Sequence, residues 1–339
     1  MVYERQVIEV IHFQRKPGTR GFSIERLFDD LREAMPSDIF CRKQIALYFS
    51  QGLWPRVASI LAARRTAGRV NHITGDIHFL ALGLPQGSTL MTIHDCGILR
   101  RSDGLKHALL KLFWFTLPIA RCRVVVAISE ATRRELIELA GAPPEKIRVI
   151  HDCVSPEFRP SPAVFNSTRP TILILGTAPN KNLQRMAIAL GGLACLVELV
   201  GRLSDEQRDW FDVRGICLLE LGDITNTEIL NAYRRCDLVL FASTHEGFGL
   251  PILEAQALGR PVVTSNCSSM PEVAGDAACL VDPSDPRSIR AGVESVMYDE
   301  NLRAALVRRG FENVRRFSAG KIAAEYASLY REIAAAQTR

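Results

Sequence analysis

The chain has 339 residues, of which 47% are hydrophobic and 23% are charged, a composition typical of a globular protein with buried cores. This length favours about two domains. No apolar run reaches the ~18 residues expected of a membrane-spanning helix. Charges interrupt the apolar N-terminal stretch, which predicts a first strand rather than a signal peptide.

The net charge and the cysteines restrict the possible binding partners and the cellular compartment. A net charge of +5 is modest. It fits an enzyme of anionic substrates or one that visits an acidic membrane surface, and we predict no nucleic-acid partner. The nine cysteines are odd in number and scattered, without a CxxC or another metal-ligand spacing. We therefore expect buried thiols in a reducing cytoplasm rather than disulfides or a metal site.

Short apolar runs alternate with helical patterns along the whole chain, which predicts α/β architecture with parallel sheets. In the first half, helical patterns cover 24–34, 53–65, 105–122 and 130–139. The strands predicted between them are 7–13, 40–47, 70–73, 89–93, 124–128 and 147–150.

The second half repeats the alternation after a proline-rich segment, 155–170, that has the composition of a linker. We expect two Rossmann-like domains, 1–160 and 161–317, with a tail helix at 318–336 that packs back towards the first. One stripe of that helix carries Ile322, Tyr326, Leu329, Tyr330 and Ile333. The predicted strands of the second half are 171–175, 195–200, 216–221, 238–241, 261–264 and 278–281.

Ligands of open α/β sheets bind beyond the carboxyl ends of the strands, so the segments after the strands are the candidate sites. The most informative is HEGFGLPILEAQALGRPVVTSN (245–266). Gly247 and Gly249 let the backbone approach a ligand, and Pro251 suits the start of a helix. A strand, a glycine turn and a helix start together make an anion site.

Two glutamates, Glu246 and Glu254, stand on either side of this turn. Glu246 lies in the turn and Glu254 about one turn into the helix, so the pair can bracket one bound molecule and accept hydrogen bonds from sugar hydroxyls. The alternative is an ordinary strand–helix turn whose acidic residue suits the helix dipole.

The segment resembles the E-x7-E motif of the GT4 family of retaining glycosyltransferases. The resemblance runs almost continuously over 221–283, and it includes VVVAISEATRRELIELAGAPPEKIRVIHDCV (124–154) and TIHD (92–95). It is strongest to bacterial surface-polysaccharide mannosyltransferases. Because it covers both halves of the chain, it implies the GT-B fold, in which two Rossmann-like domains face each other across a cleft.

The resemblance also implies roles for matching residues of the second half. Glu246 would contact hydroxyls of the donor sugar, and Glu254 would hold the ribose of the nucleotide. Lys181, in LGTAPNKNL (175–183), would neutralise the donor diphosphate. A cation is chemically sensible there, since charge grows on the leaving group in the transition state. Further donor contacts are implied for Thr177, Asn180, Asp223, Ile224, Gly247, Phe248, Gly249 and Leu250.

One departure from the family pattern concerns the diphosphate. Many relatives carry an arginine shortly before the lysine, whereas this chain has Thr177, Ala178, Pro179 and Asn180. Either Asn180 and the helix N-terminus suffice, or Arg20 of the first domain contributes. No Asp-x-Asp triplet occurs in the sequence, so we expect neither a metal ion nor another cofactor.

In the first half, His94 of TIHD matches the family histidine that lies close to the donor sugar, which implies a catalytic role. A structural histidine is the alternative, and Asp95 is predicted to shape the turn. The basic loop HFQRKPGTRGFSIERLF (12–28) matches the family's glycine-rich loop, with Gly21 near the donor and Arg20 near the acceptor. A plain surface loop is the alternative here.

Two further residues of the first half follow a predicted strand. His72 and Asp76 lie in NHITGDIHFL (71–80), where they could border the acceptor pocket. Separately, HALLKLFWFTLPIARCR (107–123) mixes large apolar and basic residues. Such a helix can lie in a membrane interface, or it can pack on the sheet as a domain helix. We expect a cytoplasmic protein, with the cytoplasmic face of the inner membrane as one location.

The resemblance implies that a sugar moves, with retention, from a nucleoside diphosphate donor to a saccharide or lipid-linked saccharide acceptor. The first hypothesis for the donor is GDP-mannose, and the expected mechanism is front-face substitution. The alternatives are a nucleotide-sugar epimerase or a phosphorylase of the same fold, and a catalytically silent subunit that binds glycans or supports a partner.

Overall fold

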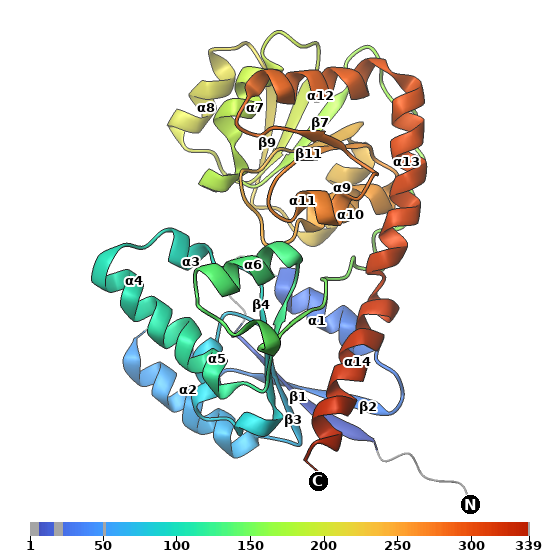
Figure 1. Ribbon diagram of the computed structural model, residues 1–339. Coiled ribbons are helices and arrows are strands. Elements are labelled where there is room, and N and C mark those ends of the chain that lie inside the picture. Colours follow the sequence, from blue (N-terminus) through green and yellow to red (C-terminus); the bar gives the residue numbers. More distant parts are fainter. Residues whose placement is uncertain (1–6, 17–22, 50–51, 338–339) are drawn as a thin grey trace, which may run out of the picture. The chain divides into compact units, whose positions relative to one another are not determined.

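The computed structural model describes residues 7–16, 23–49 and 52–337, which form two compact units, each with its own parallel sheet (Figure 1). The first unit consists of the chain up to Cys153 together with the C-terminal segment that begins at Ala319. The second unit is Val154–Ser318. The α/β class and the two parallel sheets predicted from the sequence are confirmed.

The first sheet has six parallel strands in the order β2-β1-β3-β4-β5-β6. Its central strands are buried along their whole length, so most of their residues are apolar on both faces, although β3 also buries Asn71 and His72. The predicted strands agree with the observed bounds to within two residues. The strands are β1 Ile8–Gln14, β2 Ile39–Ile45, β3 Val70–Ile73, β4 Thr89–Ile93, β5 Val124–Ala127 and β6 Ile147–Val149.

The helices of this unit include one that arrives from the far end of the sequence. Helix α14 (Ala319–Ala335) lies beside α1 (Ser23–Glu33) over one face of the sheet (Figure 1). The whole predicted stripe of α14 is buried, in a core shared with Val10 and Phe28. The other helices are α2 Leu53–Thr66, α3 Gly97–Arg100, α4 Gly104–Leu110, α5 Leu117–Arg121 and α6 Glu130–Glu138, with 3-10 turns at His78–Leu82, Gln86–Ser88 and Pro144–Lys146.

The helix predicted at 105–122 is not one regular helix. A π-helical segment, Lys111–Thr116, separates α4 from α5. Pro118 has no N–H to donate to the carbonyl of Trp114, and the ring Nδ1 of His78 donates to that carbonyl instead, at 3.0 Å. The break in the regular helix therefore accompanies Pro118, and the side chain of His78 makes the hydrogen bond that the proline cannot make.

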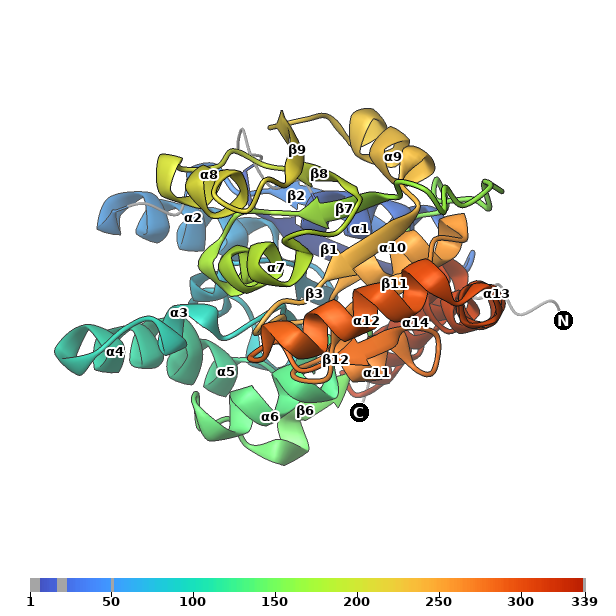
Figure 2. The same ribbon diagram turned by 90° about the horizontal axis from the view of Figure 1, so that it is seen from above.

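The second sheet is also fully parallel, in the order β12-β11-β10-β7-β8-β9. Helices α7 and α12 lie side by side over one face, above an apolar core (Figure 2). The helices are α7 Leu183–Leu190, α8 Asp205–Asp212, α9 Asn226–Arg235, α10 Leu250–Leu258, α11 Met270–Ala274, α12 Pro286–Tyr298 and α13 Glu300–Val314, with 3-10 turns at Pro179–Lys181 and Arg315–Phe317. The strands are β7 Thr171–Leu175, β8 Leu196–Val200, β9 Cys217–Gly222, β10 Leu238–Phe241, β11 Val262–Ser265 and β12 Cys279–Val281.

All nine cysteines lie within the described residues and are free thiols. The prediction of buried thiols is right for five of them, but Cys217 on the edge strand β9 is exposed. Burial raises the pKa of the Cys122 thiol to about 12, so it stays protonated. Within residues 7–16, 23–49 and 52–337, no helix combines the length and the apolar character that crossing a bilayer requires.

Candidate active site

The topology of the second sheet marks one position for a ligand. From β7 the chain proceeds outward through β8 and β9 and then returns to place β10 on the other side of β7. The strand order therefore reverses between β7 and β10, and ligands of open parallel sheets bind where the order reverses. The loops that follow these two strands carry Lys181 and Glu246.

The structure brings the predicted catalytic residues of this unit into direct contact. Lys181 Nζ lies 2.6 Å from Glu246 Oε1, and both side chains are largely shielded from solvent, with 19% and 15% exposed. Asn180 Nδ2 donates to the same Oε1 at 3.1 Å and to the carbonyl of His245 at 2.9 Å. Lys181 Nζ also lies 4.7 Å from the ring centre of Phe241. Lys181 and Asn180 thus both donate to Glu246 Oε1, at the switch point between β7 and β10 where the strand order reverses.

The loop after β7 takes its shape from two positive-φ residues. Gly176 has φ of +86°, a conformation that favours glycine, and a Cβ there would lie 3.0 Å from the Lys181 side chain, which would have to shift. Asn182 has φ of 64° and begins α7. Its side-chain amide donates to the carbonyls of Ala242 and Pro283, which fixes this loop against the segments after β10 and β12.

The anion site predicted from the sequence falls at the start of α10. Gly249 precedes the helix with φ of +117°, a conformation that side chains rarely adopt, and Pro251 stands in the first turn. The N-cap residue of α10, Gly249, has no side chain that could cap the first turn. Phe248 and Gly249 are buried, whereas Gly247 and Leu250 are partly exposed. A helix N-terminus in this form attracts negative charge.

Two serines that sequence reasoning missed hold the glycine turn in place. Ser268 Oγ donates to the carbonyl of Glu246 at 2.6 Å and accepts from the backbone N–H of Glu246. Ser269 Oγ lies 2.6 Å from the carbonyl of Phe248. The available signal was the run Ser-Ser before Met270-Pro271, which has the pattern of a helix start. These serines fix where the Glu246 side chain begins.

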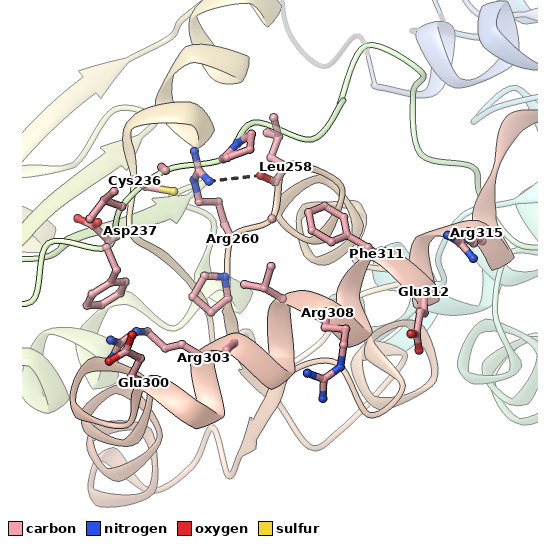
Figure 3. A pocket seen from close by; sticks show the side chains of 18 residues that line it. Cys236, Asp237, Leu258, Arg260, Glu300, Arg303, Arg308, Phe311, Glu312 and Arg315 are labelled. Atoms are coloured by element: carbon pink, nitrogen blue, oxygen red, sulfur yellow. Dashed lines mark hydrogen bonds between the residues drawn. The ribbon is translucent and has the colours of Figure 1, made fainter.

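Glu254 has a buried partner that the sequence did not reveal. The phenol of Tyr233, on α9, donates to Glu254 Oε2 at 2.6 Å. Burial, followed by the charge of Glu254 and this hydrogen bond, raises the pKa of Tyr233 well above its usual value, so the phenol keeps its proton. The backbone of Tyr233 is held in turn by Arg260 Nε at 3.0 Å. Figure 3 shows Arg260 reaching the carbonyl of Leu258 as well.

The remaining predicted donor residues lie at the same edge of the sheet. Asp223 and Ile224 follow the edge strand β9, and Asp223 pairs with the exposed Arg202 at 3.1 Å. Arg202, directly beyond β8, is a cation that sequence reasoning overlooked. Thr177 is partly buried, and its carbonyl accepts from Gln207 Nε2 at 2.8 Å. The donor residues predicted for the second unit therefore gather at the carboxyl ends of β7, β9 and β10.

In the first unit, His94 follows β4 and is almost fully buried. Its Nε2 donates to the carbonyl of Thr74 at 3.1 Å, and Nδ1 lies 3.8 Å from Asp152 Oδ2. Burial alone would lower the pKa of His94, but the close approach and charge of Asp152, with the charge of Asp76 and the Thr74 carbonyl, outweigh it and raise the pKa. Asp152, beyond β6, is a further partner that sequence reasoning missed. Asp95 shapes the turn as predicted, accepting from the N–H of Gly97 at 2.7 Å.

The prediction that His72 borders an acceptor is wrong. Its side chain is fully buried, and both ring nitrogens have protein partners: Nδ1 lies 2.7 Å from the Tyr330 hydroxyl and Nε2 lies 2.8 Å from Thr92 Oγ1. The sequence pattern could not show this, because Tyr330 arrives on α14 from the other end of the chain. His72 is a structural core residue.

The buried hydrogen bonds around His72 form a chain with one direction. Arg32 can only donate, so His12 Nδ1 accepts and His12 Nε2 donates to Tyr330. Tyr330 then donates to His72, which donates to Thr92, whose hydroxyl lies 3.0 Å from the phenol of Tyr326. Burial first, and then the charge of Arg32, lowers the pKa of His12 to about 3. Burial likewise lowers the pKa of His72, so both rings are neutral.

Asp76, the other predicted acceptor residue, is half exposed and lies 3.3 Å from Arg15 Nη1. This contact joins the segments that follow β1 and β3, where the strand order of the sheet reverses, and Arg15 also pairs with Glu25 of α1 at 2.6 Å. Arg20 and Gly21 lie outside the described residues. Ser129 caps the start of α6, since its hydroxyl accepts from the N–H of Thr132 at 3.0 Å.

Two family models match the chain, one in each half. Residues 8–158 match Glycosyltransferase Family 4, and residues 219–313 match Glycosyl transferases group 1. The second match contains Glu246, Glu254 and Tyr233, and the first contains His94 and Asp152. The family resemblance expected from the motifs is confirmed.

Known proteins of the same kind are similar over much of the chain. The O-antigen chain mannosyltransferase B of Escherichia coli is 29% identical over 220 residues, covering 58% of this chain and 57% of its own length. The D-inositol 3-phosphate glycosyltransferase of Thermobispora bispora is 28% identical over 77% of this chain and 68% of its own length. The crystal structure of Anabaena HepE with UDP and glucose superposes with a TM-score of 0.76 at 16% identity, covering 96% of this chain and all of that one.

Proposed function

Because the chain is a glycosyltransferase of the GT4 type with the GT-B fold, we propose that it transfers a hexose from a nucleoside diphosphate sugar to a saccharide acceptor. The donor of the proposal is GDP-mannose, and the acceptor is a saccharide or a lipid-linked saccharide of a surface polysaccharide. The mannosyltransferase of Escherichia coli supports the choice of mannose. The UDP in the HepE structure makes UDP-sugars the second candidate.

One observation carries the proposal: the 2.6 Å contact between Lys181 and Glu246 at the switch point, beside the start of α10. A cation and a helix N-terminus favour a diphosphate, and the carboxylate favours sugar hydroxyls. Lys181 and Glu246 form an ion pair with each other in this structure. Binding a donor would let Lys181 turn to the phosphates and free Glu246 Oε1 to accept from the sugar.

The proposed reaction is a front-face substitution with retention. The bond between C1 of the sugar and the diphosphate oxygen breaks, and its electron pair stays on the diphosphate. The acceptor hydroxyl forms the new bond to C1 from the same face and gives its proton to the departing oxygen. Lys181 and the N-terminus of α10 would stabilise the growing phosphate charge, without a metal ion, while the sugar passes through an oxocarbenium-like state.

His94 belongs to the proposal as the catalytic residue of the first unit. Its Nε2 proton is donated to the Thr74 carbonyl, so this nitrogen is not available as a base, and His94 would act by orienting the sugar. Asp76 stays a candidate for the acceptor side. We propose that the reaction takes place in the cytoplasm, at the inner face of the membrane.

The test is acceptor-dependent turnover by the purified protein. GDP-mannose and UDP-glucose are each incubated with a panel of mono- and disaccharides, with and without EDTA, and release of the nucleoside diphosphate is measured. We expect release with GDP-mannose that needs an acceptor and resists EDTA, and NMR should show the donor's anomeric configuration in the product. Glu246→Ala should abolish turnover without unfolding the protein.

Other outcomes would favour the alternatives. An epimerase would convert the sugar nucleotide with no acceptor present. A phosphorylase would need inorganic phosphate and no nucleotide. A silent subunit would give no turnover although it binds a glycan or a partner, and full activity of Glu246→Ala would contradict the assignment of the site.

A further inference from the structure

The first unit carries an open apolar groove between α2 and the helical segment formed by α4 and the π-helical turn. Its volume is about 620 Å³. The wall is made almost entirely of hydrocarbon side chains, among them Leu53, Val57, Leu105, Leu109, Phe113 and Trp114. We call the groove with the exposed residues around it the apolar face.

The residues of this face are exposed to a degree that is unusual for their type. Leu53 is 73% exposed, Trp54 81% and Leu105 76%. Within α2 only Ser59 and Ala63 are buried, and no residue of α4 is buried. A surface helix normally turns polar residues to solvent, whereas the outer sides of these two helices are largely apolar. A contiguous apolar surface of this kind marks an interaction site.

The second unit provides an internal comparison. It also has an open groove, of about 680 Å³, between the segment at 162–165 and α13. That groove is rimmed by charges of both signs, with Glu300, Arg303, Arg308 and Glu312 around it (Figure 3). Val164 is the large exposed apolar residue among the residues that line it. The lining of the first unit's groove contains more of them, namely Leu53, Val57, Leu105, Leu109 and Phe113.

The two segments that carry the apolar face are rich in basic residues. Segments 52–66 and 97–123 together contain nine lysines and arginines and one acidic residue, Asp103. One of the nine, Arg100, pairs with Glu135 at 2.6 Å. Lys106 is exposed at the groove, and Arg64 and Arg65 are exposed on the last turn of α2. Arg56 lies over the Trp114 ring at 4.9 Å and joins the two walls.

We propose that the apolar face docks on the surface of an anionic phospholipid bilayer. The exposed leucine, tryptophan and phenylalanine side chains enter the acyl region, an acyl chain lies in the groove, and the surrounding lysines and arginines meet the lipid phosphates. Apolar area and positive charge together are the combination that holds a protein in the interface without spanning it. A protein partner of ordinary composition would not require so one-sided a charge.

The test is cosedimentation of the full chain with vesicles, in the absence of any sugar nucleotide. Vesicles of phosphatidylcholine alone are compared with vesicles containing about a third phosphatidylglycerol, in low and high salt. We expect binding to the anionic vesicles that weakens with salt and little binding to the neutral ones. Equal binding to both vesicle types, or none to either, would overturn the proposal.

Two double variants separate the apolar and the electrostatic contributions. Trp54→Ser with Leu105→Ser removes apolar contacts, and Lys106→Glu with Arg65→Glu reverses charge. Each should weaken binding at least tenfold. Their controls, in the second unit, are Val164→Ser with Val213→Ser and Arg308→Glu with Arg315→Glu, which make the same kinds of change at exposed positions. Controls that weaken binding as much as the test variants would overturn the assignment to this face.

A second copy of the chain is the competing occupant. Size-exclusion chromatography with light scattering would detect a dimer that Trp54→Ser with Leu105→Ser dissolves, and that result would replace the bilayer by a protein interface. The vesicle assay contains no donor and no acceptor, so its outcome does not depend on the proposed transfer. Failure of the transfer assay would in turn leave vesicle binding unchanged.

Discussion

In the first unit a chain of hydrogen-bonded polar side chains crosses the core beneath α14, from Arg32 to Tyr326. In the second unit the core beneath α7 and α12 is apolar, and the polar side chains of the candidate site gather beyond the ends of β7 and β10. Both units have six parallel strands. Similar architecture thus holds polar residues in two different places. Those of the first unit connect the sheet to a distant helix, and those of the second lie beyond the strand ends, where open parallel sheets bind ligands.

The largest loss of activity should follow a substitution in the second unit. Lys181→Ala removes the one cation that the described structure places on Glu246 Oε1, and we expect turnover of the donor to fall by about 10²–10³. The thermal midpoint should change little, because the side chain lies at the mouth of the loops rather than in the apolar core. Steady-state kinetics measure the effect, with Arg287→Ala, a substitution at an exposed position, as the control. Activity within a factor of three of the wild type would contradict the role of Lys181.

A substitution in the polar chain of the first unit should lower the free energy of unfolding. Tyr330→Phe removes the hydroxyl that links His12 and His72, and it leaves a buried donor and a buried acceptor without their partner. We expect a loss of about 2–4 kcal/mol in the free energy of unfolding. Urea unfolding compared with Tyr298→Phe, whose ring is mostly exposed, gives the number. A loss no greater than that of the control would show that the polar chain does not fasten α14.

The stability of the first unit should fall in mild acid more than that of the second unit. The pKa of His12 is about 3 in the folded protein and about 6.5 when unfolded, so the unfolded state takes up the proton first as the pH falls. The stabilisation from the neutral ring is complete above pH 6.5 and declines by about 1.4 kcal/mol per pH unit below it. Between pH 6.5 and 5 the loss is about 2 kcal/mol, in a window where carboxylates hardly titrate.

Tryptophan fluorescence can follow this difference. A variant that keeps only Trp210 reports on the second unit, and one that keeps only Trp114 reports on the first. His94 does not offset the trend, since its raised pKa contributes stability that is already complete below pH 6.5 and is lost as the pH rises through its folded value. Equal pH dependence of the two reporters would contradict the comparison.

The smallest effect concerns the fine positioning of Glu254. Tyr233→Phe removes the 2.6 Å hydrogen bond to Glu254 Oε2 but keeps the ring and the backbone contact to Arg260. We expect the Kd for the donor nucleotide to rise about two- to tenfold, with kcat at saturating donor nearly unchanged. Isothermal titration measures the affinity. A change in thermal midpoint without a change in affinity would mean that the phenol is only structural.

The sequence predicted what depends on neighbours in the chain. Buried parallel strands are apolar runs, so their positions were found to within two residues, and the stripe on α14 revealed its buried side. The glycine turn and helix start at 247–251 are also local. The family motif added the expectation that Lys181 and Glu246 serve one ligand, and the structure finds them in contact.

The remaining features depend on residues far apart in the sequence. His72 and Tyr330 are separated by 258 positions, so a histidine at the end of a strand looked like a site residue although it is a core residue. Tyr233 faces Glu254 from a different helix, and Ser268 supports Glu246 from the loop after another strand. The apolar face needs two helices to come together, and no single segment predicts its groove.

The most direct test of the central claim, that the second unit holds a nucleoside diphosphate sugar between Lys181, Glu246 and Glu254, is a thermal-shift screen against GDP, UDP, dTDP and their common sugars. A hundredfold excess over Kd adds about 2.7 kcal/mol of stability. We predict that GDP and GDP-mannose raise the midpoint of the wild type but not that of Glu254→Ala, which would also name the base. No shift with any nucleotide, or equal shifts for both proteins, would contradict the account.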